Sequence, residues 1–399
     1  MDTSPFSTEE LTEAWERVRD NHGCAGVDGV TVDDFDKADE ARLAELAKRV
    51  REQTYRPLPL LKIVVEKRPG SAKMRQLLVP CVVDRILQTA AARRLSRSFE
   101  EEFLESSYAY RPGRGVDRAI ARVTQWRDMG FLYVVDGDIE QFFDRVGHEE
   151  LLGLLARQNP GELMMDLLRQ WVRGSIWNGS RVNRIRRGLA QGSPLSPLLA
   201  NFFLGAFDLE LEKSGNHLVR YADDFLVMCA SEEAARDALE KTGLALEGLG
   251  LKLNREKTRI TGFLSGFQFL GVFFLGERVW IPWKEKRPEG KLLYAAPPMP
   301  AHMLWRYQSV TAPRTEMERA FHKAGRTIAS SAERVDEQAG VTGAGGKKGR
   351  AYVAYLYITE QGATLRKSGD RFLVEKDDRI LADLPYHKLE NVLISATCR

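Results

Sequence analysis

The stretches FLYVVDGDI at residues 131–139 and LVRYADDFLVMCA at residues 218–230 decide the fold. The first is a short, apolar, β-branched run that ends in carboxylates, which predicts a buried strand with Asp138 at its C-terminal tip. In the second, LVRY and FLVMCA flank Ala222, Asp223 and Asp224. This arrangement predicts two apolar strands that meet at an acidic tight turn.

Helical patterns lie between and after these strands. Apolar residues recur at helical spacing over 164–171 and 235–249, and a further helix over 198–203 can begin only beyond Pro194 and Pro197. The order of strand, helices, hairpin and helix is that of a split βαβ sheet with helices on one face. We therefore expect an α+β layer whose paired strands bring the three carboxylates together.

Length and composition exclude several classes of protein. A chain of 399 residues predicts two or three folding units, and 43% hydrophobic with 29% charged residues indicates a globular protein. No apolar run reaches the ~18 residues of a membrane span, and the start is acidic and polar, so we expect a soluble, cytoplasmic protein. The four cysteines show no CxxC spacing, which argues against a zinc module or a disulfide framework.

Basic residues are clustered although the net charge is only +3. Residues 51–80 carry seven Lys or Arg against two acids, residues 169–187 carry six arginines and no acid, and residues 276–350 carry 14 basic and 8 acidic residues. Three such patches suit a polyanion that follows a groove. The alternative is three solvated faces, which charge alone does not exclude.

The acidic residues predict a metal site. Three carboxylates that converge on one point repel one another unless a hard dication lies between them. Two magnesium ions about 3.5–4 Å apart would bridge Asp138, Asp223 and Asp224, one activating an attacking hydroxyl and the other steadying a leaving pyrophosphate. The alternative is a pair of acidic turns, which is the commoner meaning of an isolated Asp-Asp.

Seven blocks over roughly residues 25–275 resemble a reverse transcriptase of the group II intron lineage. In chain order they are RQLLVP with DRILQ (75–88), SSYAYRPGRG (106–115), DIEQFFDRVGH (138–148), GLAQGSPLSPLLAN (188–201), YADD (221–224), GLKLNREKT (250–258) and FQFLGVFF (267–274). The resemblance implies a right-hand polymerase fold. Its fingers would span residues 1–120, its palm 121–275 and a short, helical, thumb-like region 276–340.

The resemblance also implies roles for individual residues in the palm. Asp138 and Asp223 would be ligands of two Mg ions, or of Mn, with Asp224 as a third carboxylate and the Ile139 carbonyl as a minor ligand. Two further residues take part in the implied chemistry: Phe143 would be a steric gate against a ribose 2′-hydroxyl, and Lys257 would protonate the leaving pyrophosphate. A core aromatic and an exposed lysine are the alternatives for these two.

Other residues are implied to contact nucleotides or nucleic acid. Guanidinium and ammonium groups offset charge on phosphate oxygens without covalent chemistry. The implied nucleotide-binding residues are Arg68, Lys73, Arg75, Gln191 and Gly192, and the implied template-backbone residues are Arg111 and Arg114. The partners would be an RNA template, a DNA or RNA primer and deoxynucleoside triphosphates.

The last part of the chain has a different character. A glycine-rich linker over residues 341–350 precedes short strand patterns, and residues 355–394 resemble the opening β-domain of the CRISPR spacer-acquisition integrase. Residues 351–399 would be a partial copy of that domain, a fusion without integrase activity of its own. The implied partners are the CRISPR integrase and its small companion protein.

These observations predict an RNA-directed DNA polymerase that serves CRISPR spacer acquisition from RNA. The alternatives within the lineage are a group II intron maturase with reverse transcriptase activity and a stand-alone antiphage reverse transcriptase. A non-catalytic RNA-binding scaffold with the same fold is the alternative from a different class.

Overall fold

The computed structural model describes residues 6–37, 39–66, 73–281 and 292–304, and five strands between Tyr355 and Ile394. Two compact units are present, Met1–Arg334 and Val335–Arg399. Residues 305–340 of the expected thumb-like region and the glycine-rich linker lie outside the described residues. No helix in the described part of the chain has both the length and the apolar character needed to cross a bilayer.

A four-stranded antiparallel sheet forms the centre of the first unit. Its order is β6 (His217–Tyr221), β7 (Asp224–Cys229), β3 (Tyr133–Asp138) and β8 (Arg259–Gly262). Because β7 lies between β3 and β6 and is antiparallel to both, β3 and β6 run in parallel with one strand inserted between them. The predicted split βαβ arrangement and the acidic hairpin are confirmed.

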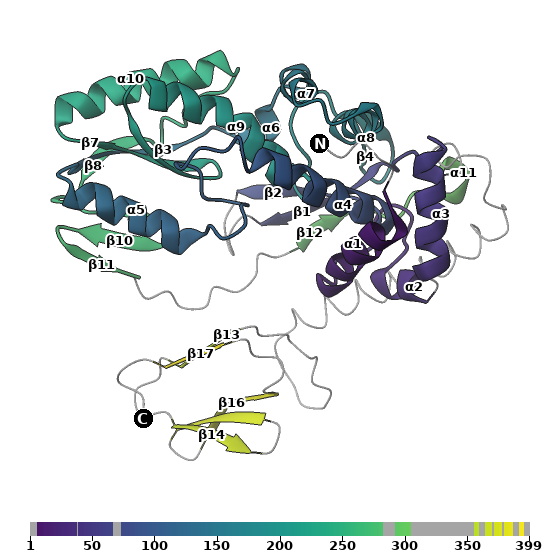
Figure 1. The fold of residues 1–399 in the computed structure, drawn as a ribbon. Coiled ribbons are helices and arrows are strands. Elements are labelled where there is room, and N and C mark those ends of the chain that lie inside the picture. The colour runs from purple at the N-terminus through teal and green to yellow at the C-terminus, as the bar shows by residue number, and fades with distance from the viewer. Residues whose placement is uncertain are drawn as a thin grey trace. The chain divides into compact units, whose positions relative to one another are not determined.

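Helices cover both faces of this central sheet (Figure 1), so the expectation of helices on one face is wrong. Successive residues of β3 and β7 are apolar, and each face is buried in a core of its own. On one face lie α9 (Ser196–Lys213) and α10 (Glu232–Gly248), and on the other lies α5 (Val116–Asp128). The connection from β3 to β6 also contains three shorter helices. These are α6 (Phe142–Arg145), α7 (His148–Arg157) and α8 (Glu162–Val172).

The start of α9 differs from the sequence-based expectation. The helix begins at Ser196 and includes Pro197 in its first turn, rather than beginning beyond both prolines. Proline is compatible with this position, because backbone N–H groups of the first turn have no partner within the helix.

Four helices from the N-terminal region pack against the central layer. Ser7 and Glu10 form a capping box at the start of the first of them, which fixes where that helix begins. Their buried faces join those of α7–α10 in one continuous hydrophobic core. The four helices are α1 (Thr8–Asp20), α2 (Val32–Asp36), α3 (Asp39–Arg51) and α4 (Val82–Phe99).

A second sheet is built from segments far apart in sequence. Within the basic cluster of residues 51–80, β1 (Leu60–Glu66) and β2 (Met74–Val79) form an antiparallel hairpin in the fingers range. β1 also pairs with β4 (Ser175–Trp177) and β12 (Leu292–Ala295). The fifth strand, β5 (Val182–Arg184), pairs with β4. Parts of the expected palm and thumb-like ranges therefore belong to the same sheet as the fingers hairpin, because strand pairing does not follow sequence distance.

A third, separate sheet follows the central one in the sequence and contains the FQFLGVFF block. It contains β9 (Phe267–Phe269), β10 (Val272–Leu275) and β11 (Arg278–Trp280). Phe267 stacks on Phe274 with ring centroids 5.0 Å apart, and both rings belong to a core that α5 and the central sheet complete. This packing holds the third sheet against the face of the palm opposite α10.

The second unit contains only strands among its described residues. β13 (Tyr355–Ile358) pairs in parallel with β17 (Asn391–Ile394). A separate antiparallel sheet has the order β14 (Thr364–Ser368), β15 (Arg371–Lys376), β16 (Arg379–Pro385). The prediction of a β-rich tail agrees with these strands.

A close backbone contact joins the fingers hairpin to the palm. The Leu78 N–H of β2 donates a 2.7 Å hydrogen bond to the carbonyl of Gln191. At the next residue, Gly192, φ is +126° and an added Cβ would lie 2.8 Å from the Leu78 carbonyl oxygen. Glycine is therefore required at position 192, because β2 lies too close to leave room for a side chain. The sequence alone did not reveal this reason.

We predict that Gly192→Ala lowers the free energy of unfolding by about 1–3 kcal/mol, because the new methyl group displaces β2 and the backbone is left-handed. Urea unfolding measures this. Gly113→Ala is the control for backbone strain, since its φ is +67° but the space around it is open. Gly205→Ala, in α9 with open space, should be neutral or stabilising. Equal losses for Gly192→Ala and Gly113→Ala would contradict the steric explanation.

Candidate active site

The acidic residues meet where the central strands end. Asp138 and Asp224 are direct partners in the antiparallel pair of β3 and β7, so their side chains leave the same face of the sheet about 5 Å apart at Cβ. Asp223 lies in the two-residue turn between β6 and β7, after Ala222, whose φ is +58°. The structure therefore brings the three predicted carboxylates to one end of the sheet.

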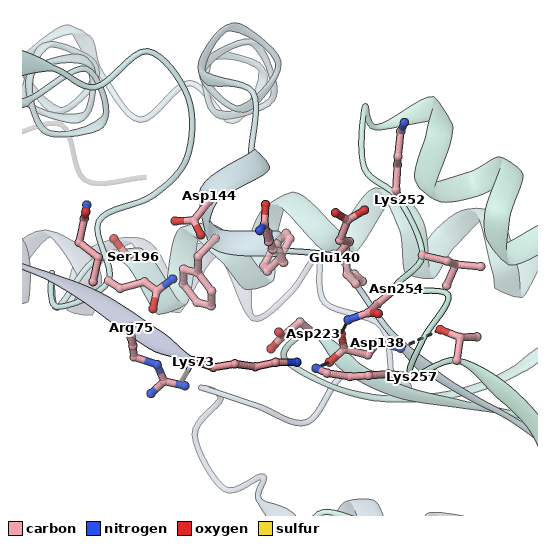
Figure 2. A pocket seen from close by; sticks show the side chains of 18 of the residues that line it. Lys73, Arg75, Asp138, Glu140, Asp144, Ser196, Asp223, Lys252, Asn254 and Lys257 are labelled. Atoms are coloured by element: carbon pink, nitrogen blue, oxygen red, sulfur yellow. Dashed lines mark hydrogen bonds and ion pairs between the residues drawn. The ribbon is translucent and has the colours of Figure 1, made fainter. Parts of the chain in front are cut away.

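Residues of the loop 250–258 hold Asp138 through hydrogen bonds and an ion pair (Figure 2). The Asn254 side-chain amide donates a 2.8 Å hydrogen bond to Asp138 Oδ1, and the Asn254 backbone N–H donates to the Asp138 carbonyl at 2.8 Å. Lys257 Nζ forms an ion pair with Asp138 Oδ2 at 2.5 Å. The block GLKLNREKT thus fixes the orientation of this carboxylate and places a cation beside it.

The electrostatics of the cluster favour a bound cation. Removal of water by surrounding protein atoms, followed by the charges of Asp223 and Asp138, raises the pKa of Asp224 to about 6 although the residue reaches the surface. Partial burial also raises the pKa of Asp136, which forms an ion pair with Arg259. Positive charge would relieve this repulsion.

The donor atoms fit magnesium, because carboxylate and carbonyl oxygens are its preferred protein ligands. Within the described residues, however, no three His, Cys, Asp or Glu side chains are already arranged around a common metal position. Binding of ions would therefore require side chains such as Asp138, now paired with Lys257, to exchange partners.

One groove contains most of the predicted site residues. Its volume is about 1450 Å³, above the ~300–1,000 Å³ of ordinary small-molecule sites. Figure 2 shows Lys73 of the fingers hairpin pointing toward Asp223 and Asp138 across this groove. The predicted residues that line it are Lys73, Arg75, Asp138, Ile139, Phe143, Gln191, Gly192, Asp223 and Lys257. Asp224 is outside this lining, and Arg68 lies outside the described residues.

Phe143 is held at the groove by its backbone. Its carbonyl accepts a 2.6 Å hydrogen bond from the Leu189 N–H, which joins α6 to the segment before Gln191. The ring is partly buried, packs 5.4 Å from the ring of Phe142 and also lines the groove. The ring therefore contacts both the core and the groove, and its role as a steric gate stays a prediction.

The expectation that Arg111 holds template backbone is wrong. Its side chain is 2% exposed and forms an ion pair with Glu100, and its Nη1 donates to the carbonyls of Leu104 and Ser107 at 2.6 and 2.7 Å. Because the N–H groups of this guanidinium are bound to acceptors within the protein, none is left to donate to a phosphate. Arg114 lies nearer the surface, where it forms an ion pair with Glu105 and stacks on Tyr108.

A buried polar network around Arg220 holds the acidic hairpin in place. The fully buried Arg220 pairs with Asp208 of α9 and donates to Asn201 Oδ1 at 2.8 Å and to the Ala222 carbonyl at 3.1 Å. Its Nη2 also donates to Ser107 Oγ at 3.0 Å. The turn that carries Asp223 is thereby tied to a helix and to the SSYAYRPGRG segment.

The sequence reasoning missed Asn254 and Arg220 as supports of the site. Signals for both were present. Arg220 is a lone arginine in the apolar run before YADD, which indicates a charge buried with partners, and Asn254 lies inside the GLKLNREKT block. Their partners are distant in sequence, so only the fold identifies what they hold.

Comparison with known protein families agrees with this geometry. Residues 65–274 match the family described as "Reverse transcriptase (RNA-dependent DNA polymerase)". Protein YkfC of Escherichia coli K12 is 31% identical over 296 residues, which cover 63% of this chain and 76% of YkfC. The group II intron-encoded protein LtrA of Lactococcus lactis is 28% identical over 195 residues, which cover 49% of this chain and only 32% of LtrA.

Two solved structures that are similar to this chain have TM-scores below 0.5. A chain of a Cas6-RT-Cas1--Cas2 complex has a TM-score of 0.38 at 18% identity. The aligned region covers 98% of this chain and 36% of the chain in the complex. Telomerase from Candida albicans has a TM-score of 0.44 at 14% identity, covering 60% of this chain and 50% of that chain. The family match over more than half of the chain, together with the similarity to YkfC, shows that this chain belongs to the reverse transcriptase family of RNA-directed DNA polymerases.

Proposed function

We propose that this chain copies RNA into DNA by magnesium-dependent nucleotidyl transfer in the groove described above, and that it does so for CRISPR spacer acquisition from RNA. The observation that supports the chemistry best is the position of Asp138 and Asp223. They come from segments 85 residues apart and line one groove at the ends of adjoining strands.

Asp138 and Asp223 would hold the divalent ions, with Asp224 and the Ile139 carbonyl as additional oxygen ligands. When bound, two such ions activate a primer hydroxyl and neutralise charge on the departing pyrophosphate. Asn254 keeps Asp138 oriented through its side chain and its backbone. Manganese would fit the same oxygen ligands.

The fingers hairpin would hold the incoming nucleotide. Arg75 on β2 and Lys73, which directly precedes β2, are exposed and line the groove with the carboxylates, where they would bind the triphosphate. Gln191 and Gly192 would form the floor beneath the nucleotide, because β2 and this segment are joined by a backbone hydrogen bond. Lys257, beside Asp138, would donate a proton to the departing pyrophosphate.

Nucleic acid would reach the groove along basic surfaces. Among the six arginines of residues 169–187, Arg169 and Arg173 form ion pairs with acids. The others, Arg181, Arg184, Arg186 and Arg187, are exposed and have no ion-pair partner in the described part of the chain. Such arginines suit contacts with phosphates of the RNA template, which are strong at low salt and independent of sequence.

We predict that Asp223→Ala lowers DNA primer extension on an RNA template at least about a thousandfold, since it removes a metal-binding carboxylate. Chelation of divalent ions should have the same effect on the wild-type chain. Asp237→Ala is the matched control, because Asp237 lies on the exposed surface of α10 and does not line the groove. Full extension by Asp223→Ala would refute the assignment of the site. A wild type that binds the template and primer but never extends the primer would instead favour the scaffold role.

We predict that Phe143→Ala lowers discrimination against ribonucleotides roughly tenfold or more, because it removes the ring that would collide with a 2′-hydroxyl. Phe143→Tyr keeps the ring and should keep the discrimination. The measurement is the ratio of kcat/KM for a deoxynucleotide to that for the matching ribonucleotide. An unchanged ratio in Phe143→Ala would leave the ring with a packing role only.

The CRISPR role is supported by the second unit. Residues 355–394 resemble the first domain of the spacer-acquisition integrase, and the described strands β13–β17 lie within this range. Strands β14 and β16 each pair on one side within the described sheet, and an edge of this kind is suited to pairing with a partner strand. A full-length integrase and its small companion protein would supply that partner.

Cells that express this chain with the integrase pair test this role. If a self-splicing intron interrupts a transcribed marker, new spacers that span the splice junction can arise only from RNA. We predict junction spacers with the wild type, none with Asp223→Ala, and wild-type numbers with Asp237→Ala. Acquisition of DNA-derived spacers alone by the wild type would contradict the role and favour an intron or stand-alone antiphage enzyme.

A further inference from the structure

Tyr110 is an exposed aromatic residue within a buried run. Ser106, Ser107, Tyr108 and Ala109 before it are buried, as is Arg111 after it, whereas Tyr110 is 48% exposed. The ring lines the same groove as Asp138 and Asp223. Folding therefore buries the neighbours of this residue and leaves its ring at the catalytic groove.

The backbone on both sides of Tyr110 is anchored. The Tyr108 N–H donates to the Arg220 carbonyl at 2.9 Å, and the Ala109 carbonyl accepts from the Asn201 side-chain amide at 3.2 Å. On the other side, the buried guanidinium of Arg111 holds the carbonyls of Leu104 and Ser107. The ring is thus presented from a rigid support that shares Arg220 and Asn201 with the acidic hairpin.

The conformation of Tyr110 has an energetic cost. Its φ is +57°, in the left-handed region that bulky residues rarely adopt. Gln141, which also lines the groove, and Ala222, which precedes Asp223, have positive φ as well. Strain of this kind persists where the surroundings impose it, and it concentrates at sites that bind ligands.

The surroundings of the ring indicate what it would contact. Partial burial, and next the charge of Asp223, raise the pKa of the Tyr110 hydroxyl, whereas Arg75 acts in the opposite sense. The ring lines the groove together with Asp223 of the acidic hairpin and Arg75 of the fingers strand. An aromatic face in this place offers a non-ionic contact, which every nucleotide can use because every base has a π-face.

We propose that Tyr110 packs its ring against a nucleotide at the growing end of the template–primer duplex and so holds that end beside the catalytic carboxylates. This inference rests on the proposed function of the groove. It transfers to Tyr110 the nucleic-acid contact that the sequence had suggested for Arg111.

Binding of the full chain to a 3′-recessed RNA template–DNA primer duplex tests the proposal. Fluorescence anisotropy without nucleotides gives the Kd at several KCl concentrations. Tyr110→Ala should raise the Kd about five- to a hundredfold, with an unchanged slope of log Kd against log[KCl], because no charge is removed. Tyr110→Phe should bind like the wild type, since it keeps the ring. A blunt duplex should show little difference between wild type and Tyr110→Ala.

Two further variants make the result unambiguous. Tyr133→Ala is the matched control, because Tyr133 is 37% exposed on β3 but does not line the groove, and it should bind normally. Tyr110→Gly removes the ring and relieves the left-handed strain. Its melting temperature should equal or exceed that of the wild type while its binding is weakened like that of Tyr110→Ala.

Unchanged binding by Tyr110→Ala and Tyr110→Gly would overturn the proposal, as would equal losses for Tyr110→Phe and Tyr110→Ala. A smaller salt slope in Tyr110→Ala would also overturn it, because the contact would then be ionic. Primer extension separates this inference from the proposed function. A wild type that binds the duplex through Tyr110 but never extends a primer would contradict the function alone, and normal extension with unchanged Tyr110→Ala binding would contradict the ring contact alone.

Discussion

The buried Arg220 guanidinium is the interaction on which the geometry of the site depends. It joins Asp208 and Asn201 of α9, Ser107 of the loop before α5, and the carbonyl of Ala222 in the acidic turn. A charge removed from water is tolerated only when its donors are all satisfied, since an uncompensated buried charge costs several kcal/mol. The network therefore holds the hairpin with Asp223 and the segment with Tyr110 in one fixed relation.

A second constraint acts on the opposite side of the groove. Asp138 is held by Asn254 and Lys257, and the fingers strand β2 meets the Gln191–Gly192 segment through backbone contacts. The groove is thus enclosed by four segments, each attached to the palm by specific hydrogen bonds rather than by loose packing alone. Preorganised groups of this kind can act on a nucleotide without a large reorganisation of the protein.

The distribution of charge across the groove suits polymer synthesis. Carboxylates gather at the ends of β3 and β7, where partial burial and mutual repulsion raise the pKa of Asp224. Lys73 and Arg75 of the fingers hairpin line the same groove. A divalent ion would relieve the repulsion on one side, and a triphosphate would balance the cations on the other. The two halves of the site would then complement the two charged parts of an incoming nucleotide with its metal.

Local patterns were sufficient to predict the central strands, the acidic hairpin, the helices α8 and α10, and the convergence of Asp138 with Asp223, because periodicity and turn chemistry act over a few residues. Only the tertiary structure decided three other features. These are the pairing of residues 175–184 and 292–295 with the fingers hairpin, the requirement for Gly192, and the burial of Arg111 beside an exposed Tyr110. The physical reason is that burial and hydrogen-bond partners depend on segments distant in the chain. An arginine has the same sequence signature whether its donors meet a phosphate or the carbonyl groups of its own protein.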